Sequence, residues 1–190
     1  MNPPAADEGL AYLTFPSPLG ELSLISSASA IVQLSFSALD PPPKPVTLGP
    51  AAALAAEARR QVDAFLAGHR RLFDLPLEPR GTAFQLAVWN AMLTIEYGKT
   101  RSYGEVARTI GANAGASRAV GLACGQNPIP LIIPCHRVVA SGGRLGGFGG
   151  GLDRKRFLLH LERLGKPPRA VPQTAPAEKT GTPRQLSFDL

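Results

Sequence analysis

The chain has 190 residues, of which 44% are hydrophobic, and it carries 20 Lys and Arg against 14 Asp and Glu. This length suffices for one large domain or two small ones. No apolar run approaches the roughly 18 residues of a membrane span, so we expect no membrane partner. With two cysteines and no basic leader before an apolar segment, we expect free thiols in the cytoplasm and not a disulfide-linked secreted protein.

The positive charge is concentrated in one part of the chain. Residues 1–79 hold five Lys and Arg against eight Asp and Glu, whereas residues 80–165 hold eleven against four, a net charge of +7. A concentrated basic face supplies the sequence-independent part of the affinity for nucleic acid. Charge alone is equally compatible with a basic domain that binds no nucleic acid.

The first half of the chain predicts a small α/β domain over residues 11–79, after a flexible, Pro-rich N-terminus at 1–10. Strands are predicted at 12–15, 21–26 and 31–36. The Ala-rich stretch 51–67 predicts a helix that ends before Gly68. No chemistry is evident in this half: His69 is expected to be solvated, and no Cys/His cluster accompanies it. We therefore expect no metal and no cofactor.

Two helix starts are marked in the second half of the chain. A capping box pairs a Ser or Thr at the N-cap with a Glu or Gln three residues later. The sequence has two such pairs, Thr82 with Gln85 and Ser102 with Glu105. The first of these helices has a predicted apolar face made of Phe84, Val88, Trp89, Met92 and Leu93.

A third short helix is predicted at 117–125. Three helices with brief connections describe a helix-turn-helix unit, in which this helix would be the recognition helix with Arg118 at its N-terminal end. Its small residues, Ala119, Gly121 and Ala123, would let it press closely against DNA.

The remaining segments complete a domain over residues 80–165. Seven of the eleven residues at 141–151 are Gly, so this stretch is a loop that turns sharply or lets another group come close. A closing helix is predicted at 153–164, and a disordered tail at 166–190. The expected fold is an α/β N-terminal domain, with a small sheet plus a helix, followed by a mainly α winged-helix/helix-turn-helix C-terminal domain.

Cys135 and His136 stand together at the end of a short apolar run. A cysteine is a useful nucleophile only as thiolate, and a neighbouring histidine is the usual means of forming that thiolate near neutral pH. From these two residues alone, a buried cysteine that packs as a small hydrophobe beside an ordinary histidine remains the alternative.

The segment around this pair resembles the active-site signature of the methylated-DNA–protein-cysteine methyltransferases. It reads Asn-Pro-Ile-Pro at 127–130 and Ile-Pro-Cys-His-Arg-Val at 133–138. Further matches occur in the family's order over residues 82–164: Ser102-Tyr103, Arg118-Ala-Val-Gly121, the Gly-rich loop and Glu162. The resemblance implies DNA repair by irreversible, single-turnover transfer of the alkyl group of O6-alkylguanine, and of O4-alkylthymine, to Cys135.

The resemblance also implies a role for each catalytic residue. Cys135 would be the nucleophile, His136 the base that helps to ionise it through a bridging water, and Glu162 the carboxylate that orients the imidazole. The departing guanine gains electron density, so a nearby proton donor lowers the barrier, and that donor would be the Tyr103 hydroxyl.

The expected partner is alkylated double-stranded DNA, bound by a monomer through the minor groove. The target atom lies inside the base stack, so the nucleotide must be flipped out, and Arg118 would enter the space left behind. Asn127 would tie the recognition helix to the active-site segment. The pocket for the flipped base would be formed by Pro130, Val138, Ser141, Phe148, Gly149 and Gly150.

This sequence departs from the family pattern at Gly149, where other members carry a residue such as Ser, so a hydroxyl contact to the alkylated oxygen is in doubt. Leu161, where relatives often have His, would stand outside the relay. The N-terminal half has no cysteine, so the zinc site of some relatives cannot be built from thiols here.

Three other functions share part of this sequence pattern: a flagging protein, a winged-helix regulator and a cysteine hydrolase. A non-catalytic protein that flags alkylated bases would lack the acceptor cysteine, which is present here. A winged-helix regulator would not need Tyr103, Cys135 and Glu162, and a cysteine hydrolase would need an oxyanion-hole pattern. The terminal segment 185–190 resembles, with imperfect spacing, the Gln-Leu-x-x-Phe peptides of sliding-clamp partners, and is a candidate for a weak clamp contact.

Overall fold

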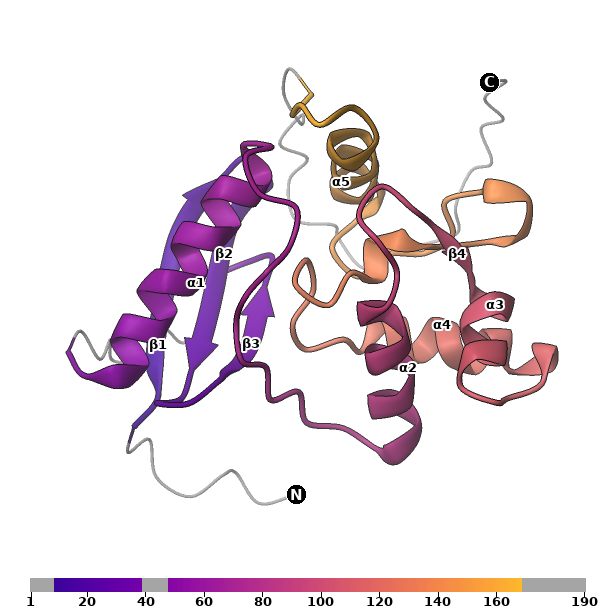
Figure 1. Ribbon diagram of the computed structural model, residues 1–190, viewed down its shortest axis with the longest axis horizontal. Helices are drawn as coiled ribbons and strands as arrows, with labels where there is room; N and C mark the ends of the chain where they lie inside the picture. The colour runs from indigo at the N-terminus through magenta and orange to yellow at the C-terminus, as the bar shows by residue number, and fades with distance from the viewer. Residues whose placement is uncertain (1–8, 39–47, 169–190) are drawn as a thin grey trace.

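The computed structural model describes residues 9–38 and 48–168. Figure 1 shows a small sheet with one helix on one side of the molecule and a group of short helices on the other. The segments expected to be flexible, 1–10 and 166–190, lie largely outside the described residues, and the candidate clamp peptide at 185–190 lies wholly outside them.

The N-terminal half contains the predicted sheet and helix. The antiparallel strands β1 (Ala11–Ser17), β2 (Gly20–Ser26) and β3 (Ile31–Ser35) pair in that order. Helix α1 (Pro50–Leu66) begins with a proline, whose fixed φ suits the first helical turn, and Gly68 follows its end with φ of 80°. The core between sheet and helix is apolar and fully buried: Phe15, Leu22, Leu24, Leu34, Ala58, Val62 and Phe65.

The outer edge of β3 is covered by chain from the second half and from the linker. The amide of Ile31 donates to Pro76 O at 2.8 Å, and Glu78 N donates back to Ile31 O at 3.0 Å. Leu34 N donates to Pro128 O at 2.9 Å, which joins the sheet directly to the segment before Cys135. An edge strand needs such partners for its backbone groups, so these bonds fix the position of the segment before Cys135 against the sheet.

The helices of the second half are α2 (Ala83–Leu93), α3 (Tyr103–Thr109), α4 (Ser117–Gly125) and α5 (Leu152–Leu164). Both predicted capping boxes are confirmed. Thr82 N donates to Gln85 Oε1 at 2.7 Å and Gln85 N to Thr82 Oγ1 at 3.3 Å. Ser102 N donates to Glu105 Oε2 at 2.7 Å and Glu105 N to Ser102 Oγ at 3.2 Å.

Short elements link these helices. They are the 3-10 turns η1 (Ala114–Ala116), η2 (Cys135–Arg137) and η3 (Ser141–Gly143) and the two-residue strands β4 (Arg101–Ser102) and β5 (Val138–Val139). β4 and β5 pair in parallel, with Arg101 opposite Val138 and Ser102 opposite Val139. This ladder brings the start of α3 next to the residues that follow Cys135.

The predicted apolar face of α2 was partly wrong. Val88, Trp89 and Met92 are buried, but Phe84 is 37% exposed and Leu93 is 45% exposed. Phe84 lies in the first turn of α2 and Leu93 is its last residue, so both stand at the ends of the helix. Trp89 lies at its centre, where Nε1 donates to Ala123 O at 2.9 Å.

That contact also corrects the prediction for α4. Ala123 is buried beneath Trp89, and Gly121 lies beside the Tyr103 ring, at 3.8 Å from where its Cβ would stand. Of the three small residues, only Ala119 is exposed. Their size therefore serves packing within the protein at two of the three positions.

We predict that Ser102→Ala lowers the free energy of unfolding by about 1 kcal/mol, because α3 loses its side-chain cap. Chemical denaturation monitored by Trp89 fluorescence would measure the loss. Thr100→Ala, at an exposed residue of the preceding loop, is the control and should change the stability little. Equal stability of the two variants would show that the cap contributes nothing.

Candidate active site

The segment 127–134 is a tight loop that presents Cys135. Asn127 holds it at both ends, since Nδ2 donates to Ile133 O at 2.8 Å and Oδ1 accepts from Ile129 N at 3.0 Å. Leu131, which is fully buried, has φ of 75°, a left-handed conformation that costs a leucine about 1 kcal/mol or more. Packing of the Leu131 side chain in the core therefore helps to hold the loop in a conformation that the chain would otherwise avoid.

Cys135 begins the single turn η2 and is only 6% exposed. Its amide donates to Ile133 O at 2.8 Å. Burial raises the pKa of the Cys135 thiol, while a hydrogen bond from Asn127 and the charge of Lys155 act in the opposite direction. The thiolate is thus unfavourable at rest, and the site must supply both a base and a compensating charge to form it.

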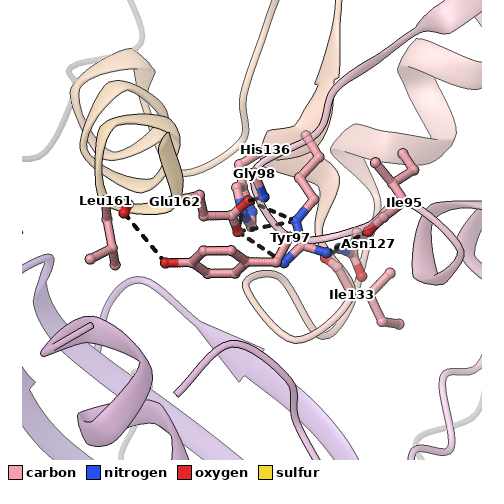
Figure 2. Close-up of polar contacts among 9 residues, drawn as sticks. Ile95, Tyr97, Gly98, Asn127, Ile133, His136, Leu161 and Glu162 are labelled. Atoms are coloured by element: carbon pink, nitrogen blue, oxygen red, sulfur yellow. Dashed lines mark hydrogen bonds and ion pairs between the residues drawn. The ribbon is translucent and has the colours of Figure 1, made fainter. Parts of the chain in front are cut away.

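The buried carboxylate of Glu162 is the common partner of several polar groups from different parts of the chain (Figure 2). His136 Nε2 lies 2.8 Å from Glu162 Oε1, and Arg137 donates from Nε to both carboxylate oxygens at 3.0 Å and from Nη2 to Oε1 at 2.9 Å. Gly98 N donates to Oε2 at 2.9 Å. Arg137 also donates from Nη1 to Ile95 O at 2.6 Å, so the guanidinium connects α5 with the loop after α2.

These partners keep Glu162 ionised. Burial alone would raise the pKa of the carboxyl group, but the hydrogen bonds and charges of His136 and Arg137 outweigh it and lower the pKa to about 2. Arg137 is the permanent cation of the group, so the pair is neutral overall and the imidazole need not be charged.

The imidazole of His136 has one ring nitrogen without a partner among the described residues. Nε2 faces the carboxylate and carries the proton in that bond, whereas the buried Nδ1 makes no hydrogen bond within residues 9–38 and 48–168. Burial is the main cause that lowers the pKa of His136, and Glu162 acts against it. A neutral imidazole with a free Nδ1 lone pair is in the right state to accept a proton from the adjacent thiol.

Lys155 is a fully buried cation near the thiol. Its Nζ donates to Val138 O at 2.7 Å and to Gly147 O at 3.2 Å. Burial lowers the pKa of Lys155, and the two cysteines act against it. Lys155 therefore ties the strand after Cys135 to the Gly-rich loop and places positive charge near the thiol.

Tyr103, the first residue of α3, lies under the Gly-rich loop. Its hydroxyl donates to Gly147 O at 3.3 Å, and burial raises the pKa of the phenol. A Cβ at Gly146 would stand 2.9 Å from that hydroxyl, and Gly146 has φ of 64°. Both the positive φ and the close approach of the Tyr103 hydroxyl favour glycine at this position.

A cavity of about 1100 Å³ opens beside Cys135. Among the residues predicted to bind substrate, Asn127, Pro130, Phe148, Gly149 and Gly150 line it together with the thiol. Val138 is buried outside the cavity lining, and Ser141 is exposed in η3.

Arg118 is exposed on α4, whose outer face also carries Leu122, 70% exposed. Cys124 lines the cavity too, but its Sγ contacts Met92 Sδ at 3.5 Å, and burial raises its pKa to about 12.

The roles of two charged residues of this site, Arg137 and Lys155, were not predicted from the sequence. Arg137 was treated only as part of the motif, and Lys155 was not given a role, because charged residues are normally expected at the surface. One signal for the burial of Lys155 was available: it lies on the same helical face as Leu158 and Glu162, one and two turns away. The contribution of the N-terminal half to the cavity had no signal in the residues.

The described residues contain neither a metal-binding cluster nor a membrane-spanning helix. Within residues 9–38 and 48–168, no group of three or more His, Cys, Asp or Glu side chains is placed to hold a metal ion. No helix in the same part of the chain is long and apolar enough to cross a membrane.

We predict that Glu162 makes the stability depend on pH. A carboxyl group with a folded pKa near 2 and an unfolded pKa of about 4.3 stabilises the fold above pH ~4.3 and loses this contribution as the pH falls towards 2. Glu162→Gln should cost about 3 kcal/mol at neutral pH and should flatten the pH dependence of the free energy of unfolding below pH ~4.3. Urea unfolding of both proteins across this range is the measurement, with the exposed Glu78→Gln as control. Parallel pH profiles for wild type and Glu162→Gln would contradict the assignment.

The chain was compared with known families, proteins and structures. Residues 10–79 match the model of the 6-O-methylguanine DNA methyltransferase ribonuclease-like domain, and residues 83–164 match that of the DNA binding domain of the same family. A methylated-DNA–protein-cysteine methyltransferase of Mycobacterium tuberculosis is 47% identical over 156 residues, which are 82% of this chain and 94% of that protein. The protein of the same name from Haemophilus influenzae is 41% identical over 157 residues, 82% of this chain and 87% of the relative.

A solved structure agrees with these matches. The Mycobacterium tuberculosis OGT in complex with DNA superposes with a TM-score of 0.73 at 47% identity, covering 83% of this chain and 95% of that one. The two matched models together span most of the sequence, and their order is the order of the two halves described above. The chain belongs to the 6-O-methylguanine DNA methyltransferase family.

Proposed function

We propose that this protein repairs DNA by moving the alkyl group of O6-alkylguanine, and of O4-alkylthymine, onto its own Cys135. The thiolate attacks the sp³ carbon, the S–C bond forms as the C–O6 bond breaks, and the electron pair leaves with the base. Among the described residues around Cys135, no group is suited to break the resulting thioether, so each molecule would react once. The observation that carries this proposal is a buried thiol in a large cavity, adjacent to a neutral imidazole that is held by a buried carboxylate.

Thiolate formation would depend on three groups. The free Nδ1 of His136 would take the thiol proton, directly or through a bridging water, and Glu162 would stabilise the imidazolium so formed. Lys155 would offset the negative charge on sulfur. Arg137 would be a positioning residue, since it touches the carboxylate and not the thiol.

The departing base would be protonated by Tyr103. Its hydroxyl donates at present to Gly147 O, a carbonyl that also accepts from Lys155. Lys155 can keep that carbonyl satisfied when the phenol turns towards a bound guanine, so the exchange leaves the carbonyl with a hydrogen-bond partner.

The base would be flipped into the cavity from the minor groove. Arg118, exposed in the first turn of α4, would occupy the vacated position in the stack, and Asn127 would link this helix to the thiol loop. Pro130, Phe148, Gly149 and Gly150 would contact the base, with Val138 and Ser141 supporting the loop at its two sides. Gly149 offers no side-chain hydroxyl to the alkylated oxygen.

Three further expectations belong to the same proposal. The protein would act as a monomer, because each step uses groups of one chain. It would act in the cytoplasm. The segment 185–190 would add a weak sliding-clamp contact. The alternative of a non-catalytic flagging protein is not favoured, since relatives sharing 47% of their residues with this chain are named as methyltransferases.

We predict that incubation with duplex DNA carrying O6-methylguanine adds the mass of one methyl group to the intact protein, on the peptide that contains Cys135. Cys135→Ala should gain no mass while still binding the DNA. Cys124→Ala is the matched control and should react fully, because Cys124 packs against Met92 and has a high pKa. Methylation of Cys124 in the Cys135→Ala protein would overturn the assignment of the acceptor.

We predict that Arg118→Ala lowers the transfer rate on duplex DNA about tenfold, a loss in the usual range for one DNA-contacting arginine. The rate with the free base O6-benzylguanine should stay unchanged, because no flipping is needed. Arg163→Ala, at an exposed arginine of α5, controls for the loss of one positive charge. An equal loss on free base and duplex would place Arg118 outside the flipping step.

A further inference from the structure

One wall of the reaction cavity comes from the N-terminal half of the chain. Besides Cys135 and the Gly-rich loop, the lining includes the β1–β2 turn and the residues at the end of β3. The Leu34–Pro128 backbone bond places β3 against the active-site segment, so this wall is fixed and does not depend on a loose contact.

Phe36, which follows β3, is the largest side chain that this half contributes to the cavity lining. Its ring lies 5.6 Å from the ring of Phe148, at an interplanar angle of 58°. Tilted aromatic pairs at this separation attract each other beyond the effect of area burial. Phe36 is thus packed on the one aromatic residue of the Gly-rich loop that would contact the flipped base.

Gly150 shows how closely the two aromatic rings approach the loop. A Cβ at this position would stand 2.6 Å from a Phe36 ring carbon and 2.8 Å from a Phe148 ring carbon. The loop is therefore in contact with Phe36 and cannot retreat in that direction. Phe36 acts as a fixed support behind the part of the loop that borders the cavity.

Arg154, near the start of α5, locks this arrangement. Nε donates to Leu19 O in the β1–β2 turn at 2.7 Å, and Nη1 donates to Gly150 O at 2.8 Å. The guanidinium also lies over the Phe36 ring, 5.4 Å from its centroid. One side chain thus joins the turn, the loop and the aromatic support.

The Gly-rich loop is also held by hydrogen bonds to its Gly147 carbonyl. Gly147 O accepts from both Lys155 and Tyr103. The loop is therefore held by Lys155 and Tyr103 at Gly147 and by Arg154 at Gly150. The contact between the Phe36 and Phe148 rings can change without breaking any of these hydrogen bonds.

We propose that Phe36 is a specificity-determining residue, which limits the size of the alkyl group that Cys135 can accept. This rests on the proposed function of Cys135. An alkyl group larger than methyl must extend from the sulfur into the cavity that Phe148 and Phe36 border, and the Phe36 ring prevents Phe148 from moving back to make room. With a smaller side chain at this position, the Phe148 ring can turn into the vacated space while the bonds of the loop to Lys155, Tyr103 and Arg154 stay in place.

The test compares two substrates in the same duplex, one with O6-methylguanine and one with O6-benzylguanine, by following the fraction of alkylated protein with intact mass. Phe36→Ala should raise the ratio of the benzyl rate to the methyl rate about tenfold, a typical effect of a changed volume in an apolar pocket. Phe36→Leu should give a smaller rise. Phe73→Ala is the matched control, since Phe73 is a partly buried aromatic of the same half that packs on Phe65 at 5.0 Å, away from the cavity lining.

The possible results separate the two levels of the proposal. No alkylation of the wild-type protein by either substrate would overturn the function of Cys135 itself. Methyl transfer by the wild type, with a substrate ratio in Phe36→Ala and Phe36→Leu equal to that of the wild type, would overturn the role of Phe36. A fall of both rates with an unchanged ratio counts as the same negative result, and thermal unfolding of the Phe36→Leu protein verifies that the comparison is made on folded material.

Discussion

The architecture depends on one buried carboxylate. Glu162 sits at the last full turn of α5 and accepts hydrogen bonds from His136, Arg137 and Gly98, which belong to two other parts of the chain. An ion pair this deep adds little net stability over an apolar substitute, but removing one partner leaves a buried charge unpaired. This penalty fixes the position of α5 against η2, because a shift of the helix would separate Glu162 from its partners and leave an uncompensated charge in the core.

A second constraint joins the two halves of the molecule. β3 shares backbone hydrogen bonds with the linker and with Pro128, and Arg154 reaches from α5 to the β1–β2 turn. Buried residues from both halves belong to a single hydrophobic cluster. The N-terminal half is thus more than a passive neighbour of the DNA-binding half, because it provides part of the wall of the reaction cavity.

Much of this could be predicted from the sequence where the signal is local. Capping boxes fix Thr82 and Ser102 as helix starts, and the small sheet and α1 follow from strand and helix patterns. The motif placed Cys135 and His136 together, and the carboxylate partner came from resemblance. The burial of Lys155 has only a weak signal in the sequence, its place on the helical face of Leu158 and Glu162, because burial of a charged group depends on partners distant in sequence. The outward positions of Phe84 and Leu93 depend on distant partners in the same way.

The two-residue ladder of β4 and β5 has a geometric consequence. It places Tyr103 directly after one paired strand and His136 two residues before the other, so parallel backbone bonds hold together the two residues that we propose as proton donor and proton acceptor. The Gly-rich loop is attached to the same framework, because Gly147 O accepts from both Tyr103 and Lys155. A base that displaced the Tyr103 bond would leave the Lys155 bond and the ladder in place, so the separation of the two proposed proton-transfer groups would remain set by the backbone.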